Sequence, residues 1–157
     1  VKLGHASERR VHLYVQGRGA SPPFVAADPG LESGLVRAHY SAASLVREAG
    51  TRGPASDRNS VVSGGQEEIQ SMGTIATDHL AAAVADIRAA VAIELLCAIE
   101  VRSILDPDLP AGAATVVDGL AEHLASEDRS AQIDTVAGLI ADGTVDTLAA
   151  EAGVTLP

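Results

Sequence analysis

Aromatic side chains are nearly missing from this chain. Its 157 residues include no tryptophan, two tyrosines and one phenylalanine, so alanine, valine, leucine and isoleucine supply most of the hydrophobic share of 46%. Small and straight side chains let helices approach closely and lose little conformational entropy in a helix. The composition therefore favours an all-α fold, and the length allows a single domain, residues 1–157, with a core of its own.

Positive charge is also scarce. Eleven lysines and arginines face 21 aspartates and glutamates, which gives a formal net charge of −10. Such an excess of negative charge argues against nucleic acid or an anionic membrane surface as a partner. The longest apolar run, residues 81–99, is interrupted by Asp86, Arg88 and Glu94, which argues against a membrane span. With no visible secretory signal either, we expect a cytoplasmic protein.

Residue patterns for metal binding or independent catalysis are lacking as well. The single cysteine, Cys97, lies in an apolar run and is expected to be a buried core residue in a reducing compartment. The five histidines are scattered, and neither Asp78-His79 nor Glu122-His123 has the spacing of a zinc site, so no metal is expected. A nucleophile-elbow sequence is absent too.

Helical periodicity and helix-breaking residues divide the chain into elements. The proline pair Pro22-Pro23 excludes regular helix from the loop 16–30, and Pro107 and Pro110 end the longest helical segment. Residues 50–65 form a polar, glycine-containing connection whose length is typical of a functional loop. The pattern predicts the end of a helix within residues 1–15, a helix at 34–49 and a long central helix at 74–104. Small peripheral helices are predicted within about 112–152, near 113–125, 129–142 and 144–152.

The long central helix is apolar around most of its circumference. At 1.5 Å per residue it would be roughly 46 Å long. A helix that is hydrophobic on every side must be enclosed by other elements, and the remaining short helices are too few to cover it. We therefore expect partner chains to complete a helical bundle around it at the core of an oligomer.

One loop carries candidate chemistry. Residues 63–73 read Ser-Gly-Gly-Gln-Glu-Glu-Ile-Gln-Ser-Met-Gly. The glycine pair is not a phosphate loop, because no Lys-Ser or Lys-Thr follows it and Glu67 and Glu68 would repel phosphate. Gln66 and Glu67 instead place an amide beside a carboxylate, groups that can hold a polar substrate and position protons. The following helix would offset part of the charge of Glu67. On residue types alone, a solvated acidic loop that caps this helix is the simpler interpretation.

Residues 63–73 also resemble the segment S-A-N-Q-E-D-H-V-S-M-G of histidine ammonia-lyases, which belong to the family of histidine, phenylalanine and tyrosine ammonia-lyases and aminomutases. Other motifs of this family agree in the same order: S-E-R-R at 7–10, G-L-N-S-G at 30–34, A-I-E-L-L at 92–96, and the pattern of the C-terminal helices at 127–143. The whole chain is thus similar to the C-terminal part of such an enzyme.

The resemblance implies a function that this chain does not complete alone. Family members form the electrophile 4-methylidene-imidazole-5-one (MIO) from an internal Ala-Ser-Gly, which is absent from this sequence. The resemblance therefore implies a larger MIO-bearing partner chain, a hetero-oligomer with a tetrameric core, and an ammonia-lyase that is inactive without that partner. It gives Gln66 a catalytic role beside MIO. It also makes Glu67 the residue that binds the side chain of a small amino-acid substrate, histidine or another polar one, whereas Glu68 is expected to be structural.

Several positions depart from the family pattern. Gly65 stands where the family has asparagine, Ile69 where it has histidine, and Glu32 where it has the asparagine of G-L-N-S-G, so hydrogen bonds of a histidase are missing or altered. A 2,3-aminomutase subunit, a non-catalytic assembly or regulatory subunit, and a fragment of a full-length lyase remain alternatives. Tyr40 lies where some members also carry an aromatic residue, and we expect it to belong to the core.

Overall fold

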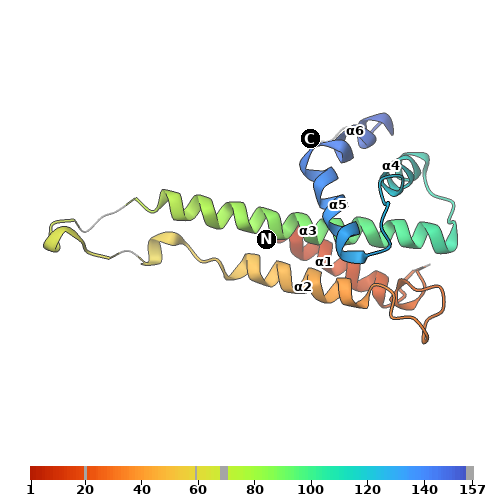
Figure 1. The fold of residues 1–157 in the computed structure, drawn as a ribbon, viewed down its shortest axis with the longest axis horizontal. Helices are drawn as coiled ribbons and strands as arrows, with labels where there is room; N and C mark the ends of the chain where they lie inside the picture. Colours follow the sequence, from red (N-terminus) through yellow and green to blue (C-terminus); the bar gives the residue numbers. More distant parts are fainter. Residues whose placement is uncertain (20, 59, 68–70, 155–157) are drawn as a thin grey trace.

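The computed structural model describes residues 1–19, 21–58, 60–67 and 71–154. Within these residues the fold is all-α, with two isolated β-bridges and no strand (Figure 1). Three single 3-10 turns lie in the connections: η1 (Pro23–Val25), η2 (Ala55–Arg58) and η3 (Ser63–Gly65). The helices are α1 (Lys2–Val15), α2 (Val36–Thr51), α3 (Gly73–Leu105), α4 (Ala111–Ala121), α5 (Arg129–Ala141) and α6 (Thr144–Glu151).

The predicted elements are confirmed, including the fold class and the long central helix. The helix expected at 74–104 is α3, and the expected small C-terminal helices are α4, α5 and α6. The proline pair in the first loop is followed by the short turn η1 and no α-helix. Asp128 begins α5 by accepting a hydrogen bond from the Ala131 N–H at 3.1 Å, which satisfies one free backbone donor of the helix.

Two hydrophobic clusters hold the helices together. The larger joins α1, α2 and the second half of α3, and its fully buried side chains include Val11, Leu35, Ile93, Leu96 and Cys97. The smaller joins the end of α3 to α4, α5 and α6, around Ile99, Val117, Leu120 and Leu139. Figure 1 shows α1, α2 and α3 lying side by side, with α4, α5 and α6 gathered near the C-terminal end of α3.

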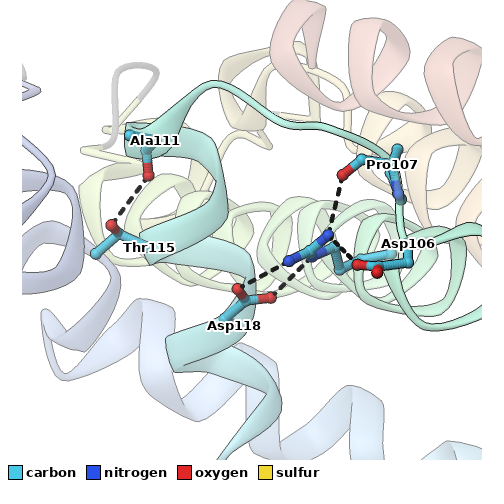
Figure 2. A network of polar contacts seen from close by, with 6 residues as sticks. Asp106, Pro107, Ala111, Thr115 and Asp118 are labelled. Carbon is cyan, nitrogen blue, oxygen red and sulfur yellow. Dashed lines mark hydrogen bonds and ion pairs between the residues drawn. The ribbon is translucent and has the colours of Figure 1, made fainter.

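An arginine closes the corner between α3 and α4. Arg102 donates hydrogen bonds to Asp106 at 2.6 Å, to the Pro107 carbonyl at 2.9 Å and to Asp118 at 3.2 Å. These interactions span the point where α3 ends, at which Asp106 adopts the left-handed conformation with φ 43°. Figure 2 shows Asp118 of α4 facing Asp106 and Pro107 across this network. The fixed corner directs the chain from α3 back toward the small helices.

The first half of α3 is covered only in part by the chain's own elements. Every buried residue of this helix lies at or after Ala90, and none of residues 73–89 is buried. Leu80 is 64% exposed and Val84 is 45% exposed. Because exposed leucine and valine side chains cost free energy in water, this half of the helix is suited to contact with another chain. None of the helices in the described ranges has the length and apolar character needed to cross a membrane.

Candidate functional site

The residues of the candidate motif form a tight turn between Val62 and Glu67. The Val62 N–H donates to the Glu67 carbonyl at 3.1 Å, and the Glu67 N–H donates to the Val62 carbonyl at 3.3 Å. Within the turn, Gly64 and Gly65 have φ of 64° and 90°. Glycine enters this left-handed region without the steric cost of a Cβ atom. The glycines therefore let the chain reverse immediately before Gln66 and Glu67.

Gln66 and Glu67 are adjacent and exposed on this turn. No hydrogen bond or ion pair joins either side chain to another described residue, so the amide and the carboxylate are available to an external group. The amide can donate and accept hydrogen bonds at once, and an ionised carboxylate accepts from N–H donors. Glu68 and Ile69 lie outside the described residues. The roles assigned to Gln66 and Glu67 remain predictions.

The turn lies far from the chain's own core. Figure 1 shows the segment between α2 and α3 extending beyond the ends of both helices, away from the packed part of the molecule. α3 begins at Gly73, one residue before the predicted start, so Glu67 precedes the first residue of the helix by six positions. The stabilising effect of a helix dipole is confined to the first turn of the helix and does not reach this carboxylate.

Two other residues singled out in the sequence do not join the turn. Glu32 is exposed in the loop before α2, whereas the turn follows α2, so the length of that helix separates Glu32 from Glu67 (Figure 1). Tyr40 was expected in the core, but it is 68% exposed on α2. Helical periodicity places Ala38, Ala42 and Val46 on the buried face and leaves Tyr40 outside it.

Two of the family motifs are structural in this chain. In S-E-R-R, the Ser7 hydroxyl donates to the Ala90 carbonyl at 3.2 Å, and Arg10 binds Glu94 with two hydrogen bonds, of which Nη2 to Oε2 measures 2.8 Å. In A-I-E-L-L, Ala92, Ile93 and Leu96 are completely buried, and Glu94 is the partner of Arg10. These motifs therefore join α1 to α3.

The glycine that ends the motif at 30–34 also has a structural role. Gly34 has φ 48°, and a Cβ atom at this position would lie 2.1 Å from the Phe24 carbonyl oxygen. No side chain fits at that distance. The loop before α2 can thus pack against η1 only because residue 34 is glycine.

Sequence reasoning missed a cluster of ionisable side chains between α1 and α2. The Nε2 atom of His39 lies 3.0 Å from Glu8, and the His39 ring centroid lies 5.3 Å from that of His12. Glu8 and His12 are four residues apart and hence on one helix face, but their contact with α2 depends on tertiary packing. Among the described residues, no three histidine, cysteine or acidic side chains are placed to hold a metal ion.

Comparison with known proteins places the chain in a family. The family profile "Aromatic amino acid lyase" matches residues 1–122. A probable histidine ammonia-lyase of Halobacterium salinarum is 37% identical over 161 residues, which cover 94% of this chain and 31% of that protein. The histidine ammonia-lyase of Bacillus cereus is 40% identical over 101 residues, or 63% of this chain and 20% of that protein. The chain thus spans less than a third of the length of these curated relatives.

Solved structures of similar proteins support the assignment. The crystal structure of histidine ammonia-lyase from Trypanosoma cruzi matches 97% of this chain and 31% of its own, with a TM-score of 0.84 and 29% identity. Tyrosine aminomutase from Streptomyces globisporus matches 99% of this chain and 31% of its own, with a TM-score of 0.87. Its sequence identity is 24%, so this match shows similarity of fold only. The chain therefore belongs to the aromatic amino acid lyase family.

Proposed function

We propose that this chain is the small, C-terminal part of an MIO-dependent amino-acid ammonia-lyase and that it completes the active site and tetrameric core of a larger MIO-bearing chain. The observation that carries this proposal is the turn that projects beyond α2 and α3 (Figure 1) and carries Gln66 and Glu67, two exposed residues whose side chains have no partner among the described residues. A turn of this kind can reach a site whose other residues belong to a different part of the enzyme.

The side chains on the turn suit a shared site. MIO, formed within the larger chain, would supply the electrophile for removal of ammonia from the amino acid. Gln66 is the residue of this chain that would face that group, because its amide can both donate a hydrogen bond and accept one. Glu67 would bind the side chain of the substrate. A carboxylate in a site closed from water favours an N–H or a positive charge and disfavours a plain phenyl ring, which points to histidine or another polar amino acid.

The proposal can be tested by expressing the chain together with an MIO-bearing lyase chain and following the unsaturated acid by its ultraviolet absorbance over a panel of amino acids. Replacing Glu67 by glutamine removes the charge and keeps the shape. We expect kcat/KM for the best polar substrate to fall about 10- to 100-fold, the usual loss for one hydrogen bond to a charged group. Glu127→Gln is the control and should leave the rate unchanged, because Glu127 is exposed on the α4–α5 connection and its side chain has no partner among the described residues.

Two results would refute the assigned role. One is full activity of the Glu67→Gln enzyme, and the other is equal activity when this chain is omitted. A complex that assembles without any activity would favour the non-catalytic assembly subunit. The aminomutase alternative gives a different product, because ammonia returns at the β-carbon, so a β-amino acid would be detected in place of the unsaturated acid.

A further inference from the structure

A groove at the middle of α3 combines apolar walls with one positive charge. It is formed by Leu3 of α1, by Val84, Ile87, Arg88 and Val91 of α3, and by Ile140 of α5, and its volume is about 480 Å³. Leu3 is 61% exposed and Val84 is 45% exposed, so much of this apolar wall faces solvent. The groove lies where the buried half of α3 passes into the partly covered half. We refer to these six residues as the Arg88 groove.

Arg88 lacks the ion pair that the neighbouring charged residues of α3 make. Asp86 pairs with Arg52, the residue that follows α2, Glu94 with Arg10 of α1 and Glu100 with Arg129 of α5. Arg102 pairs with Asp118 of α4. Each of these charges thus meets an opposite charge where another helix packs against α3. Arg88 is partly buried, and it has no ion pair or hydrogen-bond partner in the part of the chain that the structure describes.

The unpaired guanidinium restricts what can cover the groove. An arginine that keeps its contact with water is tolerated, but covering it with an apolar surface alone would bury an uncompensated charge, which is strongly unfavourable. A covering segment that brings a carboxylate satisfies the planar guanidinium with two parallel hydrogen bonds. The apolar wall and the single charge therefore specify a segment with apolar side chains around one acidic residue.

We infer that the Arg88 groove is the docking site for an apolar segment of the larger lyase chain that carries one aspartate or glutamate, paired with Arg88. The inference rests on the proposed two-part enzyme. More than two thirds of the length of the Halobacterium relative lies outside the region that this chain matches, so most of such an enzyme is available to supply the segment. Charge complementarity selects the acidic residue within it.

The test measures the stability of the complex of this chain with the MIO-bearing chain, by co-expressing the two chains and following dissociation of the purified complex by sedimentation over a dilution series. Arg88→Met keeps the length and apolar contact of the side chain and removes its charge. If the covering segment carries a carboxylate, Arg88→Met leaves that group buried without a partner, and we expect association to weaken at least about 10-fold. Arg88→Glu adds repulsion and should weaken it at least about 100-fold. Arg88→Lys keeps the charge and should retain part of the affinity.

Arg37→Met is the matched control, because Arg37 is exposed and unpaired on α2, outside the groove, and this variant should associate like the wild type. The purified complexes of all variants should have equal helix content by circular dichroism. Association of Arg88→Met as tight as or tighter than wild type would overturn the ion pair while the proposed function stands. A discrete dimer of this chain alone that Arg88→Glu dissociates would assign the groove to a second copy. Absence of any complex with the wild-type chain would overturn both proposals.

Discussion

At the scale of single residues, the candidate site depends on backbone geometry as much as on side-chain chemistry. The turn requires positive φ at Ser63, Gly64 and Gly65, and such a conformation costs roughly 1 kcal/mol at a residue with a Cβ atom. The sequence identified Gln66 and Glu67 as candidates and placed the start of α3 within one residue, but it could not show the turn that the backbone hydrogen bonds between Val62 and Glu67 close.

Cys97 provides a residue-scale prediction about pH. It is completely buried, and this burial, reinforced by the negative charges of Glu94 and Glu100, raises the pKa of the thiol to about 12. In an unfolded chain the thiol titrates near its ordinary pKa of about 8.5. The folded state therefore holds the proton over this interval, and stability is fully present below about pH 8.5 and is lost progressively as pH rises toward 12.

We expect the unfolding free energy of the assembled protein to fall by about 2 kcal/mol between pH 8 and pH 10 because of this thiol, since each pH unit above the unfolded pKa contributes about 1.4 kcal/mol. Urea unfolding of wild type and Cys97→Ala at both pH values isolates the effect, because the two proteins share all other titrating groups. The variant is expected to be less stable overall but to have the shallower pH dependence. Equal dependence on pH in the two proteins would contradict the assignment.

At the scale of elements, the two halves of α3 differ in their surroundings: the chain buries residues of the second half and leaves much of the first half exposed. The apolar positions surround the helix along its whole length, which allowed prediction of its bounds and of its need for enclosure. The sequence could not tell which half the chain covers itself, because this depends on where α1, α2 and α5 lie. Likewise, composition and periodicity could not reveal the ion pairs Arg10–Glu94 and Arg52–Asp86, because the two partners of each pair are far apart in the sequence.

The pair Arg10–Glu94 gives a prediction at this scale. It joins α1 to α3 through two hydrogen bonds, and the Glu94 hydrogen bond raises the pKa of Arg10 further. The Arg10 side chain is half exposed, so solvent screens much of the attraction. A double-mutant cycle with Arg10→Met and Glu94→Gln should yield a coupling energy of about 1 kcal/mol, measured by urea unfolding of the assembled protein. Strict additivity of the two changes would show that the pair does not stabilise the α1–α3 contact.

At the scale of the whole molecule, features that are separate along the sequence lie toward the same end of the structure. The turn with Gln66 and Glu67 projects away from the core, the adjoining half of α3 is only partly covered, and the Arg88 groove lies at the border of that half. The larger of the two clusters and the pairs Arg10–Glu94 and Arg129–Glu100 belong instead to the packed end. One end of the molecule is thus folded around its own core, and the other leaves polar groups, apolar surface and the Arg88 charge, which has no partner among the described residues, open to contact.

This division predicts how the isolated chain behaves. Exposed Ile75, Leu80 and Val84 on one long helix form a surface that monomeric proteins rarely keep in water, so the chain alone should aggregate or fold poorly. Sedimentation and thermal unfolding of the purified chain measure this, and co-expression with the MIO-bearing chain should turn the material into a discrete complex with a cooperative transition. Leu80→Gln combined with Val84→Gln should reduce aggregation of the chain alone and weaken the complex. A wild-type chain that stays monomeric and melts cooperatively would show that the partly covered half of α3 needs no partner.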